Sequence, residues 1–218
     1  MSAKRTEAGV LLNGNEKTEH PKIKISEKII MTEEQIVKIL KESGALLTGH
    51  FQLRSGLHSD HFFQAALLLQ YPDKAEVVCR HLAERFAGVE IETVISPAVG
   101  GLIVGQEVAR ALKCRAIFAD KEDGQLVLKR GFSIRKGEKV LVAEDVVTKG
   151  GRVQQTIDLV RSFGGDVVGV AVIVDRSGGD AKFDVPFQSA LKLSLPTYDP
   201  AACPLCAKKL PIDRPGSK

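Results

Sequence analysis

The chain has no tryptophan, and its 31 basic residues exceed its 27 acidic residues by only four. The basic residues are spread along the sequence, so no nucleic-acid-binding surface is indicated. No apolar run approaches the ~18 residues that a membrane-spanning helix requires. The N-terminus also lacks a basic stretch followed by a long apolar block, the pattern of a secretion signal. We therefore expect a cytoplasmic protein that binds neither membrane nor nucleic acid, and whose mild positive charge suits small anionic substrates.

Two common nucleotide-binding motifs are also absent. The sequence has no Gly-x-Gly-x-x-Gly after a β-rich run, and no Gly-x-x-x-x-Gly-Lys loop followed by serine or threonine. These motifs hold the phosphates of dinucleotides and of nucleoside triphosphates. Their absence argues against a dinucleotide-dependent oxidoreductase and against a P-loop nucleotidase.

Cysteine is scarce and irregularly spaced, at positions 79, 114, 203 and 206. This is too little for a disulfide framework, and we interpret all four residues as thiols in a reducing cytosol. Cys203 and Cys206 could form half of a zinc site, but a structural site needs four ligands. The sequence shows neither a second Cys-x-x-Cys nor histidines at metal-binding spacing, so a metal is the minority interpretation unless a dimer, or Cys79 and Cys114, supplies the rest.

The apolar pattern divides the chain into a tail and one domain. Residues 1–30 are polar, mixed in charge and without sustained periodicity, and we expect them to be a disordered N-terminal extension. Thr32 can then cap a helix whose first turn carries two acids and whose apolar face includes Ile36. Residues 31–218 are therefore expected to form the domain, and the proline-rich segment 199–218 is expected to close over it.

Within this domain the pattern alternates between strands and helices. Near-continuous β-branched runs at residues 93–95, 140–143 and 167–174 suit strands buried on both faces of a parallel sheet. Helical spacing follows the first two runs, at residues 102–112 and 153–163. The fold class is thus α/β and doubly wound. A separate segment, 116–134, predicts an antiparallel hairpin with a charged, mobile tip.

The strongest chemical signal begins in the second of these runs and continues to Arg152. Gly150 and Gly151 let the backbone approach an anion closely, and the N-terminus of the following helix favours a phosphate. Glu144 and Asp145 would repel a phosphate, but they can accept hydrogen bonds from two ribose hydroxyls. The arrangement predicts a ribose 5-phosphate site; the alternative is a solvated acidic turn followed by a glycine-assisted loop.

Residues 140–156 resemble the 5-phosphoribosyl 1-pyrophosphate (PRPP) binding motif of type I phosphoribosyltransferases. Three further segments, 51–63, 96–101 and 174–176, resemble the orotate-specific branch of that family and occur in its order. The resemblance implies the type I phosphoribosyltransferase fold, a parallel sheet flanked by helices with a small hood from N- and C-terminal segments.

The resemblance also assigns roles to residues. The catalytic candidates are Lys121, on the hairpin, and Asp145. PRPP would be bound by Lys121, Glu144, Asp145, Val146, Val147, Thr148, Lys149, Gly150, Gly151 and Arg152, with Ala98, Val99, Gly100 and Gly101 forming the pyrophosphate loop. Orotate would contact Thr148, Arg176, Arg54, Phe62 and Phe63. Taken alone, Arg176 fits a surface arginine and the two phenylalanines fit a core.

The implied reaction joins orotate to the phosphoribosyl group and releases pyrophosphate, in the biosynthesis of UMP. It implies Mg²⁺ held by the substrate and water with no direct protein ligand, and a homodimer. The chain departs from better-studied members at Asp120, where an arginine is usual, and at Gly100, where some carry a lysine. Lys149 and Arg152 replace smaller residues in the phosphate loop. Two alternatives remain, a phosphoribosyltransferase for a purine or other base and a PRPP-sensing regulator on the same fold.

Overall fold

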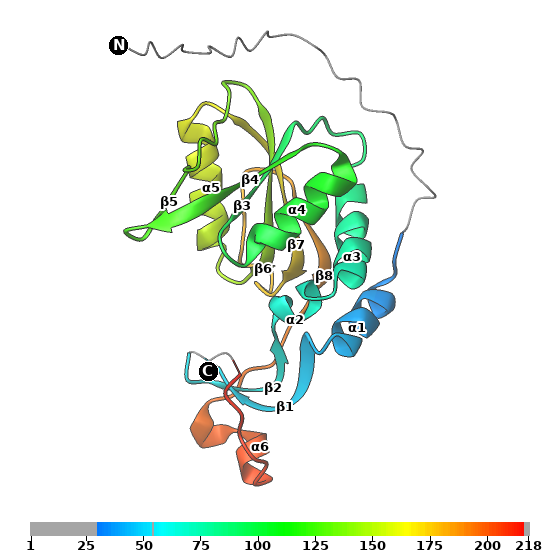
Figure 1. Ribbon diagram of the computed structural model, residues 1–218. Helices are drawn as coiled ribbons and strands as arrows, with labels where there is room; N and C mark the ends of the chain where they lie inside the picture. Colours follow the sequence, from blue (N-terminus) through cyan, green and yellow to red (C-terminus); the bar gives the residue numbers. More distant parts are fainter. Residues whose placement is uncertain (1–29, 54, 216–218) are drawn as a thin grey trace, which may run out of the picture.

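A computed structural model describes residues 30–53 and 55–215 of the chain (Figure 1). Its centre is a six-stranded sheet in the order β5-β4-β3-β6-β7-β8, in which only the β4–β5 pair is antiparallel. The strands are β3 (Thr93–Pro97), β4 (Arg115–Glu122), β5 (Gln125–Val127), β6 (Lys139–Val147), β7 (Asp166–Asp175) and β8 (Phe187–Lys192). The predicted α/β class is confirmed, and β4 and β5 form the predicted antiparallel hairpin over residues 115–127 of the expected segment 116–134.

Helices cover both faces of this sheet (Figure 1). On one face α3 (Pro72–Glu84) and α4 (Gly101–Leu112) pack together, with α1 (Glu33–Glu42) beside β8 and the short α2 (Ala65–Leu69) beside α3. On the other face lies α5 (Gly151–Ser162). The central strands are therefore buried on both sides, which explains their near-continuous apolar sequences. No helix in the described ranges has both the length and the apolar character needed to cross a bilayer.

Local sequence signals set the ends of two of these helices. Thr32 and Gln35 form a reciprocal capping box at the start of α1, which satisfies two backbone N–H groups. At the end of α5, Gly164 adopts a φ of +80°, and the N–H of Gly165 donates to the carbonyl of Val160. A glycine reaches this left-handed conformation without steric cost, so Gly164 ends the helix that was predicted over residues 153–163.

A smaller unit stands beside the main sheet (Figure 1). It contains the antiparallel pair β1 (Leu46–Gln52) and β2 (His58–Phe63), together with the 3-10 turn Pro200–Ala202 and the short helix α6 (Pro204–Ala207). The carbonyl and N–H groups of Tyr198 pair with His58, while Asp213 bonds to Gln52 and His50 on the opposite edge of the hairpin. We call residues 46–53, 55–63 and 196–215 the hood, and they confirm the predicted hood of N- and C-terminal segments.

Two predictions concern residues that the structure does not describe: the disordered extension, which falls almost entirely on residues 1–29, and the role of Arg54. Other differences between the prediction and the structure concern the bounds and the number of elements. The strand β6 runs four residues beyond Ala143, so the two acids lie within it rather than in the following loop. The sequence pattern also missed α2 and β8, which are short.

A charged cluster fastens the amino end of β6 to its neighbours. The side chain of Glu138 is almost fully buried, and it accepts hydrogen bonds from the Thr93 hydroxyl at 2.5 Å and from Arg115 at 2.6 Å. It also accepts from the backbone N–H of Arg135 at 2.8 Å. Burial alone would raise the pKa of Glu138, but these hydrogen bonds together lower it to about 2.

We expect Glu138→Gln to lower the free energy of unfolding by about 1–3 kcal/mol, because it removes charge-assisted hydrogen bonds in a buried position. The pKa of Glu138 is lower in the folded chain than in the unfolded chain. Its stabilising contribution is therefore present above an unfolded pKa of about 4.3 and is lost as the pH falls toward about 2.

Urea unfolding of both proteins at several pH values measures this contribution. The difference between wild type and variant should be largest near neutrality and should shrink below about pH 4. A difference that does not depend on pH would contradict the assignment.

Candidate functional site

The carboxyl end of β6 presents two adjacent acids at one edge of the sheet. Glu144 is buried and Asp145 is half-buried. The N–H of Asp145 donates to Glu144 Oε1 at 3.2 Å, and the N–H of Val146 donates to Asp145 Oδ1 at 2.7 Å. Burial, together with the neighbouring Asp145, raises the pKa of Glu144 well above its usual range. Such a pair can both donate and accept hydrogen bonds, which suits two vicinal hydroxyls.

The loop between β3 and α4 approaches these acids very closely. A Cβ atom on Gly100 would lie 2.8 Å from Asp145 Oδ2, and one on Gly101 would lie 3.0 Å from Glu144 Oε1. Within α4, a Cβ on Gly105 would lie 2.5 Å from Ser96 Oγ. Gly100 and Gly101 were assigned to the pyrophosphate loop, and in the structure they make room for the acids of β6.

The loop after β6 leads into a helix end that is free to bind an anion. Gly150 has a φ of +78°, and the N-terminus of α5 receives no side-chain cap. A Cβ on Gly151 would meet nothing within 4 Å, so the space beside this backbone is open. The exposed Arg152 reaches back to the carbonyl of Ala98 at 3.4 Å. The predicted phosphate and pyrophosphate loops are therefore neighbours.

Arg176 follows β7 at the same edge. Its backbone N–H donates to the carbonyl of Val147 at 2.8 Å, which holds it against the end of β6. The side chain is half-buried, its Nε is buried without a hydrogen-bond partner in the described structure, and burial lowers the pKa of the guanidinium. A buried donor without a partner is costly, so this position favours a ligand that accepts hydrogen bonds.

The β4–β5 hairpin carries the predicted catalytic cation. Lys129 forms an ion pair with Glu122 at 2.7 Å, and Arg130 pairs with Asp120 at 3.1 Å and lies over the Phe118 ring. Lys121 is exposed and makes no ion pair within the described residues. Of these three cations, Lys121 is the one whose charge is left available.

The residues predicted to contact orotate differ in how far they are buried. Thr148 is exposed in the loop after β6. Phe62 is half-buried, with its ring 5.8 Å from that of Phe51, whereas Phe63 is packed in the hydrophobic core. Phe63 is therefore a core residue, which was the alternative to an orotate contact in the sequence analysis.

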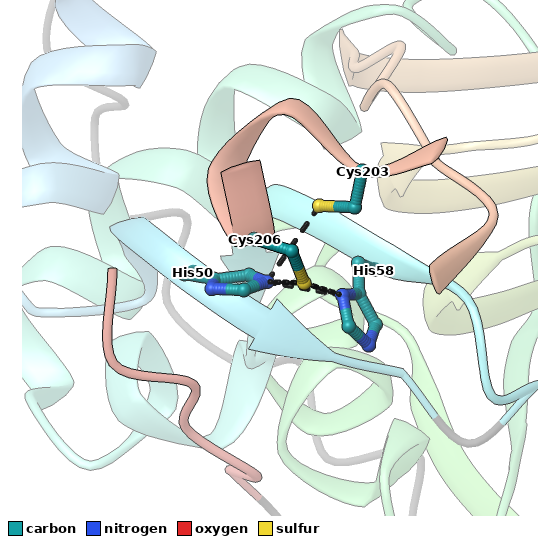
Figure 2. A group of neighbouring side chains, drawn as sticks. All are labelled: His50, His58, Cys203 and Cys206. Atoms are coloured by element: carbon teal, nitrogen blue, oxygen red, sulfur yellow. Dashed lines mark hydrogen bonds between the residues drawn. The ribbon is translucent and has the colours of Figure 1, made fainter. Parts of the chain in front are cut away.

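One group of residues was not anticipated. Cys203 and Cys206 lie next to His50 and His58, and the donor atoms of all four residues are within 4.8 Å of one another (Figure 2). The sequence shows no histidines at metal-binding spacing, but the fold brings two of them beside these cysteines. The sequence offered little signal, because the histidines and cysteines are about 150 residues apart and belong to no common motif.

A doubly wound sheet with paired acids and an uncapped helix end at its carboxyl edge is typical of α/β enzymes that bind a phosphorylated sugar. Residues 73–192 match the family model described as "Phosphoribosyl transferase domain", and the chain belongs to this family.

Known proteins agree with this assignment. The orotate phosphoribosyltransferase of Caldanaerobacter subterraneus is 50% identical over 188 residues, 86% of this chain and 99% of that protein. The solved orotate phosphoribosyltransferase of Aeropyrum pernix has a TM-score of 0.62 at 29% identity, covering 72% of this chain and 93% of that one. An adenine phosphoribosyltransferase of Rhodothermus marinus has a TM-score of 0.58 at 25% identity, covering 73% and 99%.

We expect Gly100→Ala to destabilise the chain by about 1–3 kcal/mol, since the added methyl group must displace Asp145. Gly100 has ordinary helical angles, so backbone strain adds nothing. Gly151→Ala is the matched control, because its methyl group enters open space and should not lower stability.

Thermal unfolding of the two variants measures the difference. Adding Asp145→Ala should relieve the cost of Gly100→Ala in a double-mutant cycle. Equal destabilisation by Gly100→Ala and Gly151→Ala would refute the close approach. So would additive effects of Gly100→Ala and Asp145→Ala in the cycle.

Proposed function

We propose that this chain transfers the 5-phosphoribosyl group from PRPP to orotate, giving orotidine 5′-monophosphate and pyrophosphate, a step in making UMP. Membership of the family supports the phosphoribosyl transfer. The choice of orotate is supported by the 50% identity to a protein of that name over nearly its whole length.

The observation that carries the choice of base is Arg176. Its half-buried guanidinium lies at the end of β7, where it lacks a partner for Nε in the described structure. Orotate is a flat base with a carboxylate, and a guanidinium fork can bind a carboxylate through two parallel hydrogen bonds. Adenine has no such group, so it would leave the guanidinium poorly satisfied.

The remaining groups suit PRPP. Glu144 and Asp145 would bind the two ribose hydroxyls, and the backbone from Thr148 to Arg152 would hold the 5-phosphate at the N-terminus of α5. The pyrophosphate would lie along residues 98–101. In the reaction a ring nitrogen of orotate forms a bond to C1 of the ribose while the bond from C1 to the pyrophosphate oxygen breaks. The acids hold the ribose in position and need not act as nucleophiles.

Charge on the departing pyrophosphate needs neutralising. Mg²⁺ usually keeps several waters and binds in large part through substrate phosphates, so it would need no direct ligand from Glu144 or Asp145. We propose that Mg²⁺ is bound mainly through substrate oxygens and supplies electrostatic stabilisation there. Lys121 would add a further positive charge, and closure of its hairpin would exclude water.

We extend the proposal to a homodimer. Figure 1 shows the β4–β5 hairpin extending outward from the end of the sheet. From this position Lys121 could serve the site of a second copy. The cytoplasmic location stays a prediction.

The proposal is tested by following the ultraviolet absorbance of orotate with Mg²⁺ present and PRPP either added or omitted. Orotate should be consumed only when PRPP is present, with pyrophosphate released in equal amount. Adenine, hypoxanthine and guanine serve as competing bases. Consumption of a purine in place of orotate, by folded protein, would refute the orotate assignment and retain the family chemistry.

Arg176→Gln is the matched variant for this assay. It should raise the KM for orotate about 10- to 100-fold, the worth of a charge-assisted hydrogen bond, and leave the KM for PRPP nearly unchanged. An equal loss for both substrates would count against a base-binding role.

The role of Lys121 is tested against its neighbour Lys129. Lys121→Ala should lower kcat about 100-fold or more, because it removes charge stabilisation that forms in the transition state. Lys129→Ala removes a lysine already paired with Glu122 and should change kcat little. Similar losses in both variants would contradict a specific role for Lys121.

Mixing two inactive variants tests the dimer. Asp145→Asn should lose turnover while remaining folded, since its carboxylate is assigned to substrate. If Lys121 acts across the interface, mixed dimers of Lys121→Ala and Asp145→Asn regain activity through one intact site. Absence of any gain after subunit exchange would place Lys121 in its own subunit's site.

A further inference from the structure

Four metal-binding side chains converge in the hood (Figure 2). His50 belongs to β1 and His58 begins β2, so the two imidazoles come from opposite strands of one hairpin. Cys203 caps α6 and Cys206 lies within it. Three of the four residues are buried and only Cys206 is exposed. The cluster therefore connects two parts of the chain about 150 residues apart.

The distances fit one tetrahedral ion. His50 Nε2 lies 3.0 Å from His58 Nδ1, and Cys206 Sγ lies 3.7 Å from His50 Nε2 and 3.3 Å from His58 Nδ1. Cys203 Sγ lies 3.7 Å from His50 Nε2. For a zinc ion bonded at about 2.0 Å to nitrogen and about 2.3 Å to sulfur, the ligand atoms are spaced about 3.3 Å for N···N and about 3.5 Å for N···S. The observed spacings lie close to these values.

A hydrogen bond sets the tautomer that a metal requires. Nδ1 of His50 lies 2.9 Å from the carbonyl oxygen of Leu210, which can only accept. Nδ1 must therefore carry the proton, and this leaves a lone pair on Nε2, the atom that faces the cluster. Histidine ligands in metal sites are commonly oriented by such a bond from the second ring nitrogen to a backbone carbonyl.

The end of the hairpin at Leu46 and Phe63 packs in the main hydrophobic core, whereas the end that carries His50 and His58 is held by a few polar contacts. A two-stranded hairpin is marginally stable on its own. Its outer edges are covered by short C-terminal contacts, at Tyr198 on one side and Asp213 on the other. A bound ion would fasten the hairpin to α6 at the centre of this small unit.

We propose that His50, His58, Cys203 and Cys206 bind a structural Zn²⁺ ion that holds the hood together. Two thiolates and two imidazoles in tetrahedral arrangement are a set that favours zinc over harder cations such as Mg²⁺. Four protein ligands leave no open position, so the ion takes no part in catalysis. The proposal does not depend on the identity of the substrate.

The first measurement is the metal content of the full chain, purified under reducing conditions and reconstituted with ZnCl₂. We expect inductively coupled plasma mass spectrometry to find about one zinc ion per chain. The zinc content per chain of the Cys203→Ser/Cys206→Ser variant should be lower by about tenfold or more, because a structural site needs its full ligand set.

Matched controls lie close by. Cys114→Ser removes a cysteine outside the cluster, and His61→Gln removes a hairpin histidine whose Nδ1 pairs with Asp60 at 2.8 Å. Both should keep their zinc. Wild type without zinc after reconstitution, or zinc retained by the double cysteine variant, would overturn the proposal.

Two further measurements use wild-type protein, so they do not depend on whether the cysteine variant folds. They also distinguish zinc binding from a disulfide. Removing zinc from wild type with a chelator should speed hydrogen exchange in residues 46–63 and 198–213 more than in β6 and β7, and adding zinc should reverse the change. Titrating the metal-free chain with CoCl₂ should give the visible absorption of tetrahedral cobalt with thiolate ligands. A mass lower by two hydrogens, with two fewer free thiols, would instead identify a Cys203–Cys206 disulfide and overturn the proposal.

Discussion

The structure depends on one constraint: β3, β6 and β7 run in the same direction as neighbours in a sheet covered on both faces. Parallel strands need crossover helices, and those helices bury the sheet. The carboxyl ends of the strands then meet at one edge, where the chain turns into α4 and α5. The acids of β6, the loop after β3 and Arg176 after β7 are brought together because they occupy equivalent positions on adjacent strands.

At that edge the close approach of backbone and acid decides the chemistry. Gly100 and Gly101 have no side chains, so the loop after β3 can lie against Asp145 and Glu144. The same closeness buries Glu144, and this burial, together with the neighbouring Asp145, raises the pKa of Glu144. An edge with paired acids at its centre and uncapped N–H groups beside them can bind the hydroxyls and the phosphates of one sugar at once.

The hood follows a different principle. It is too small to have an apolar core of its own. Leu46 and Phe63 pack in the main core, and the rest is joined through backbone pairs at Tyr198 and Asp213 and through the cluster of His50, His58, Cys203 and Cys206. Small units of this kind commonly rely on a metal or a cross-link in place of buried apolar area. The chain thus combines a sheet stabilised by burial with an appendage stabilised by specific polar contacts.

By itself the sequence determined the α/β class, the caps of α1 and α5, and the strand–acid–glycine–helix unit around β6, because these depend on residues near one another in the chain. It could not predict which glycine meets which acid, or whether Phe63 contacts the base or the core. Nor could it predict that Lys129 pairs with Glu122 while Lys121 forms no ion pair with another described residue. Nor could it unite two histidines with two cysteines about 150 residues away. Only the tertiary structure decided these points, because contacts between distant segments depend on how the layers pack, and no local spacing records that packing.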